Sequence, residues 1–116
     1  MNEKLELMQL RDKILTIPEI TRLVSYAMNG RDGKVYLFGS YARGKATEYS
    51  DIDLVVDSED KFLSLEIMGG IEWLIGNGID YKCQAITMSQ LTKADEEFRS
   101  SVEKDMVLIY EKTKLL

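Results

Sequence analysis

Two short polar motifs with the residue types of a phosphate and metal site lie close together in the chain. Gly39-Ser40 ends one apolar run, and ten residues later Asp51-Ile52-Asp53 begins another. A glycine lets the backbone turn tightly and approach a ligand closely, and a serine adds a small hydroxyl donor. Aspartates two positions apart on a strand project from the same face. The spacing therefore predicts a phosphate loop beside paired carboxylates.

The two carboxylates call for a cation. Asp51 and Asp53 repel each other unless positive charge lies between them. Magnesium prefers oxygen ligands and is usually held by one or two carboxylates together with substrate phosphates. Arg43 and Lys45 add positive charge to the same loop, and a helix starting near Tyr41 would direct free amides toward a triphosphate. Either motif alone is usually structural, but their combination and order favour a metal-nucleotide site.

In these motifs the chain resembles the nucleotidyltransferases of the DNA polymerase beta type, whose signature is Gly-Ser, a short spacer and Asp-x-Asp. Residues 39–46 and 50–54 look most similar to the minimal nucleotidyltransferases of prokaryotes. Members of that family (MNT) are typically encoded beside a HEPN-domain protein, and several such pairs are antitoxin and toxin. The resemblance implies an antitoxin that transfers AMP from ATP to a tyrosine hydroxyl of a HEPN toxin and silences its ribonuclease activity.

The family pattern includes a third carboxylate on a neighbouring strand, and the resemblance implies Asp80 for this role. Asp80 belongs to an alternating segment, residues 79–86, whose polar positions share one face. An ordinary edge strand with a solvated aspartate explains this alternation equally well. Asp57 is the competing choice, because it is in phase with the aspartate pair. Its place at the far end of the strand favours a turn or helix cap instead.

The resemblance also implies a role for each site residue. Gly39 and Ser40 would hold the beta and gamma phosphates of ATP, and Arg43 would support them or contact the acceptor. Two magnesium ions would align an acceptor hydroxyl with the alpha-phosphate and stabilise departing pyrophosphate. The implied catalytic residues and metal ligands are Asp51, Asp53 and Asp80. With no histidine and one cysteine, the chain has no histidine chemistry, internal disulfide or multi-cysteine zinc site of its own.

Length and composition predict one domain, residues 1–116, in the α/β (α+β) class. With 116 residues, 45% of them hydrophobic, the chain can fill a single core. A net charge of -5 argues against direct nucleic-acid binding. No apolar stretch reaches the length of a membrane span, and the N-terminus lacks a signal-peptide core, so we expect a cytoplasmic protein. Because no segment remains for an acceptor-binding domain, the acceptor is expected to dock on the surface in a hetero-oligomer.

Hydrophobic spacing predicts alternating helices and strands. Thr16 and Glu19 resemble a capping box ahead of a helix that Asn29-Gly30 would stop. The predicted fold is a small mixed sheet with helices packed mainly on one face, as in polymerase-beta-like nucleotidyltransferases, leaving the carboxylate face open. The predicted helices cover residues 5–15, 18–28, 61–75 and 94–103; the predicted strands cover residues 35–38, 51–56 and 79–86, and residues 106–110 fit a strand or a helix end.

Several readings remain open at this level. Tyr41 fits equally well as a cover for a nucleotide or as a packing residue, whereas Trp73 is expected in the core. The partner surface is expected on helices near the N-terminus. The nucleotide base is not read by any recognisable pattern. One alternative function is a non-catalytic antitoxin that inhibits by occupancy. Another is a small-molecule adenylyltransferase of the aminoglycoside-modifying type.

Overall fold

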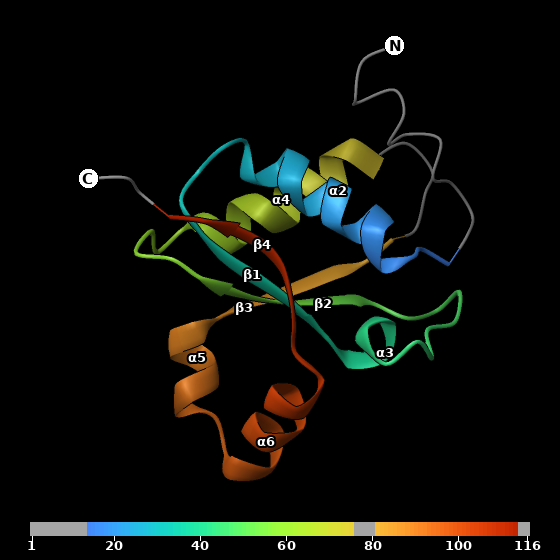
Figure 1. The fold of residues 1–116 in the computed structure, drawn as a ribbon, viewed down its shortest axis with the longest axis vertical. Coiled ribbons are helices and arrows are strands. Elements are labelled where there is room, and N and C mark those ends of the chain that lie inside the picture. Colours follow the sequence, from blue (N-terminus) through green and yellow to red (C-terminus); the bar gives the residue numbers. More distant parts are fainter. Residues whose placement is uncertain (1–13, 76–80, 114–116) are drawn as a thin grey trace.

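The fold is a four-stranded mixed sheet between helices (Figure 1). The computed structural model describes residues 14–75 and 81–113. Strand order is β3-β2-β1-β4, with β1 antiparallel to β2 and β4 and with β2 parallel to β3. The elements are α2 (Ile17–Met28), β1 (Gly33–Phe38), α3 (Gly39–Ala42), β2 (Ile52–Asp57), α4 (Leu63–Ile75), β3 (Cys83–Thr87), α5 (Met88–Lys93), α6 (Glu96–Asp105) and β4 (Val107–Lys112). The predicted mixed sheet is confirmed.

Local sequence signals fix the ends of α2 as predicted. The Thr16 hydroxyl accepts a hydrogen bond from the Glu19 amide at 3.3 Å, and the Glu19 carboxylate accepts one from the Thr16 amide at 2.9 Å. This reciprocal pair satisfies two backbone donors at the helix start. Asn29 ends the helix in the left-handed conformation, at φ 51°. The helix predicted for residues 5–15 lies almost wholly outside the described residues.

Buried side chains form two clusters, one on each face of the sheet. Helices α2 and α4 cover one face, and α5 and α6 lie on the other (Figure 1). The larger cluster lies beneath α2 and α4, where β2 contributes Ile52, Leu54 and Val56. The smaller cluster comprises Phe38, Val55, Leu91 and Val102. Most of the core therefore lies on the face that α2 and α4 cover.

The carboxylate side of β2 is only partly open. Val55, in phase with Asp53, is fully buried in the smaller cluster, whereas Asp51 is exposed. The prediction that this whole face is open is therefore wrong, because α5 and α6 cover its later part. The missed helix α5 carries a readable start signal, a capping box between Thr87 and Gln90.

The last apolar run and Trp73 had open or different predictions from the sequence. The last apolar run forms β4, which pairs with β1 and is the edge strand on that side of the sheet. Trp73 was expected in the core, but 62% of its surface is exposed. It lies on the outer side of α4, opposite the inward-facing positions. In the described parts of the chain, no helix has the length and apolarity needed to cross a bilayer.

Candidate active site

The candidate site forms where β1 ends and β2 begins. The two strands are antiparallel and place Phe38 opposite Asp53, so the turn that follows β1 lies beside the first residues of β2. Gly39 follows Phe38 directly and has φ +76°. Glycine adopts this conformation readily, whereas residues with a Cβ atom adopt it at a steric cost. Antiparallel pairing thus brings the two sequence motifs together across the intervening loop.

The backbone of Gly39 lies against the side chain of Asp53. A Cβ atom added at Gly39 would collide with Oδ2 of Asp53 and would lie 3.2 Å from its Cγ. Position 39 therefore requires glycine for two reasons, the backbone conformation and the close approach of the carboxylate. The predicted proximity of the glycine turn and the aspartate pair is present in the structure.

Asp53 has an unusual electrostatic environment. Its carboxyl group is half-buried, and burial raises its pKa from 3.8 to about 6, with a further rise from neighbouring Asp51 and an opposing effect of Arg43. Burial and a like charge both disfavour the ionised form. Within the described ranges, neither aspartate forms a salt bridge that would relieve this cost. The pair therefore favours a bound cation.

The loop after Gly39 is compact. The carbonyl oxygens of Gly39 and Ser40 accept hydrogen bonds from the amides of Arg43 and Lys45, at 3.1 and 2.9 Å. The predicted helix starts at Gly39 rather than near Tyr41 and is a single turn, so its dipole contributes little. Tyr41 is 5% exposed and packs in the larger core. Of its two possible roles, packing is the one the structure shows.

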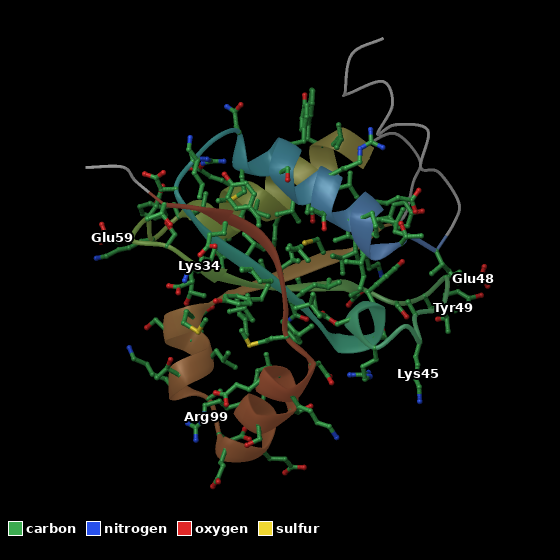
Figure 2. The ribbon with its side chains drawn as sticks, viewed as in Figure 1. Lys34, Lys45, Glu48, Tyr49, Glu59 and Arg99 are labelled. Atoms are coloured by element: carbon green, nitrogen blue, oxygen red, sulfur yellow. The ribbon has the colours of Figure 1, made fainter. Side chains whose placement is uncertain are left out.

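The two cations of this loop differ in placement. Arg43 lies near enough to Asp53 to lower the pKa of that carboxyl, and its Nη1 pairs with Oδ2 of Asp105 on α6 at 2.6 Å. Lys45 extends outward from the loop, as do Glu48 and Tyr49 (Figure 2). Only Arg43 therefore lies at the carboxylates. Sequence reasoning missed Asp105, although an acidic residue at a helix C-terminus is itself a signal for a nearby cation.

Asp80 and Asp57 were the two candidates for a third carboxylate. Asp80 lies outside the described residues, and its assignment stays a prediction. Asp57 is exposed at the far end of β2, four residues and about 13 Å along the strand from Asp53. Asp57 therefore does not share the site. Among the described residues, no three acidic, histidine or cysteine side chains come together as a metal-binding group.

The available donors fit magnesium better than a softer metal. The aspartate pair offers only oxygen ligands, which magnesium prefers. The one cysteine, Cys83, is held as a neutral thiol, because burial and then the charges of Asp53, Glu72 and Asp51 raise its pKa to about 12. A protonated thiol is a poor metal ligand. Asp51 and Asp53 are therefore the described residues that would hold a divalent cation.

Comparison with known proteins identifies the family and agrees with the fold. Residues 21–109 match the nucleotidyltransferase domain family, and the chain belongs to that family. It is 37% identical over 65 residues to the protein adenylyltransferase MntA of Thermococcus cleftensis. That match covers 52% of this chain and 64% of the relative, so the chain spans less than two thirds of that relative's length.

Two solved structures have a similar fold. A toxin-antitoxin crystallised with AMP-PNP has a TM-score of 0.56 at 21% identity, and a mutant toxin-antitoxin MntA-HpeT has 0.53 at 18%. Each match covers 84% of this chain and 75% of the other. At these identities the similarity establishes the fold alone. The predicted nucleotidyltransferase fold is confirmed.

Replacing Asp53 with asparagine should stabilise the protein at neutral pH. Because the pKa of Asp53 is raised in the folded state from 3.8 to about 6, folding favours its protonated form, and the free energy of unfolding falls as the pH rises between these two values. Asp53→Asn removes that cost, which we expect to be about 1 to 2 kcal/mol at pH 7 after allowing for solvent screening. Urea denaturation at pH 7 and at about pH 3.5 measures it, and the gain should vanish at the lower pH. Asp57→Asn is the control and should show no gain; a destabilised Asp53→Asn at pH 7 would contradict the assignment.

The contact between Gly39 and Asp53 predicts a coupled pair of mutations. Gly39→Ala should lower the free energy of unfolding by about 2 to 4 kcal/mol, from backbone strain and from overlap with the carboxylate. In an Asp53→Ala background only the backbone strain remains, so the cost should fall by about half. Gly44→Ala is the matched control, because Gly44 has φ +72° with open space around it and its cost should be the same in both backgrounds. Equal costs of Gly39→Ala in both backgrounds, measured by urea denaturation, would refute the contact.

Proposed function

We propose that this protein is a magnesium-dependent protein adenylyltransferase that transfers AMP from ATP to a hydroxyl group of a partner protein. The partner is a HEPN-domain toxin, the acceptor is a tyrosine of that toxin, and the transfer makes this chain its antitoxin. The observation that carries the proposal is the carboxylate pair beside the turn at Gly39. Family membership and the similarity to a protein adenylyltransferase support the same activity.

The proposed chemistry depends on positioning and charge. Asp51 and Asp53 would hold magnesium, with Asp80 as the proposed third ligand, and the bound metal supplies positive charge that offsets the charge of the transferring phosphate. Gly39 places no side chain against Asp53, and Ser40 would offer a hydroxyl to the phosphates. Asp53 must lose its proton to hold the metal, and its pKa without a bound cation is raised to about 6, so protonation competes with metal binding more strongly as the pH falls toward that value.

We propose that the partner docks on the outer side of α4, whereas the sequence alone favoured helices near the N-terminus. Helix α4 is apolar on both sides: its inward positions are buried in the larger core, while Phe62, just before it, and Leu65 and Trp73 are 66, 61 and 62% exposed. A helix that is apolar on both sides is normally covered on both. Glu66 and Glu72 flank this outer side, and Glu66 is already paired with Arg31 of the neighbouring loop. The surface therefore suits a partner face that is mainly apolar.

The acceptor can be identified by mass. We expect the HEPN-domain partner, incubated with this protein, ATP and magnesium, to gain the mass of AMP on a tyrosine, and we expect Asp53→Ala to abolish the gain. Intact-mass and peptide mass spectrometry measure both. Asp57→Ala is the control, since Asp57 lies at the other end of β2 and should leave transfer intact.

Two alternative outcomes would count against the proposed transfer. A stable complex with no added mass would favour inhibition by occupancy, and protection of cells by the Asp53→Ala variant would point the same way. Release of pyrophosphate on adding a small hydroxylated compound, with no modified protein, would instead favour a small-molecule acceptor. Neither outcome follows from a protein adenylyltransferase.

The proposed docking surface is testable separately. The double variant Phe62→Ser, Leu65→Ser should weaken partner binding by at least tenfold while the protein stays folded, because both side chains are already exposed. Trp73 is the single tryptophan of the chain and lies on the same surface, so its fluorescence reports binding directly. Leu108→Ser, an exposed change on β4, is the control. Unchanged affinity of the double variant would place the partner elsewhere.

A further inference from the structure

Asp105 is a largely buried acidic residue that lies outside the aspartate pair. It is the last residue of α6, where the negative end of the helix dipole disfavours an acidic side chain, and only 12% of its side chain is exposed. Burying a carboxylate is costly unless a cation pairs with it. Its partner is Arg43, whose Nη1 lies 2.6 Å from Oδ2. The two residues are 62 positions apart, so the pair joins the end of α6 to the loop of the candidate site.

Packing of α6 fixes the carboxylate where it is. Phe98, Val102 and Asp105 follow one another at spacings of four and three residues and therefore share one face of the helix. Phe98 meets Phe38 edge-on, with ring centroids 6.4 Å apart, and Val102 is buried in the same cluster. Phe38 is the residue immediately before Gly39. The same helix face that packs on the end of β1 thus carries Asp105 to the site.

The pair leaves most of the Arg43 side chain available. Only Nη1 is bonded to Asp105, and the other guanidinium N-H groups make no hydrogen bond within the described ranges. Arg43 is about half exposed and lies close enough to Asp53 to affect that carboxyl. An unrestrained arginine loses rotamer entropy when a ligand orders it. A bond to a rigidly held carboxylate removes much of that cost in advance.

We propose that Asp105 is a positioning residue, which holds the Arg43 guanidinium at the mouth of the carboxylate site so that its remaining N-H groups meet the phosphates of a bound nucleotide. This inference rests on the proposed nucleotide-dependent function but not on the acceptor. Asp105 itself touches no phosphate, since like charges repel, and it acts only through Arg43. Loss of Asp105 leaves Arg43 charged but mobile.

The test is titration of the protein with AMP-PNP in the presence of magnesium by calorimetry. Asp105→Asn should weaken binding about tenfold, and Asp105→Glu, which keeps the charge, should recover part of the loss. In an Arg43→Gln background, Asp105→Asn should have no further effect. Glu103→Gln is the matched control: it removes one negative charge from the same helix, two residues away and more exposed, and should bind as the wild type does. Thermal denaturation of each variant checks the fold.

Each result decides the question. Unchanged or tighter binding by folded Asp105→Asn would overturn the inference, because the carboxylate would then be neutral or a competitor for Arg43. An equal loss in the Arg43→Gln background would also overturn it, because Asp105 would not act through that residue. Wild-type binding without transfer to a partner would leave the inference intact and refute the proposed transferase activity. No nucleotide binding by the wild type would overturn both.

Discussion

The structure depends on one unfavourable arrangement, the half-buried carboxylate of Asp53 held between Asp51 and the backbone of Gly39. Burial and like charge raise the pKa of Asp53 to about 6, and the fold nevertheless keeps the group there. Such a cost is the kind that functional sites retain, since a cation bound between the carboxylates would reverse it. The local conformation makes the approach possible, because only glycine fits at position 39 without strain or collision.

The rest of the fold holds that arrangement in place from both faces of the sheet. Beneath α2 and α4, Ile52 and Leu54 are fully buried, which fixes the intervening Asp53 on the opposite face. On that face, α6 packs against the end of β1 and brings Asp105 to Arg43. The site therefore combines a rigid strand pair with a loop secured by a distant helix, and its carboxylates and its arginine have separate supports.

Much of this could be predicted from sequence because the signals are local. The alternation of Asp51, Ile52 and Asp53 fixes which side chains share a face, and the Thr16 capping box fixes a helix start. The remaining features depend on tertiary contacts that no local pattern contains. Trp73 has the spacing of a helix residue, but packing decides which side of α4 faces the sheet, because this helix has apolar residues on both sides. The pairing of Asp105 with Arg43 likewise joins residues 62 positions apart.

Manganese binding followed by electron paramagnetic resonance would test the central claim most directly, that the aspartate pair beside Gly39 is a divalent-cation and nucleotide site. Manganese replaces magnesium at oxygen-rich sites and reports its own bound state. We predict that the wild type binds manganese at about pH 7.5, more tightly when AMP-PNP is present, and that folded Asp53→Asn loses this binding. Binding by Asp53→Asn equal to that of the wild type would contradict the account.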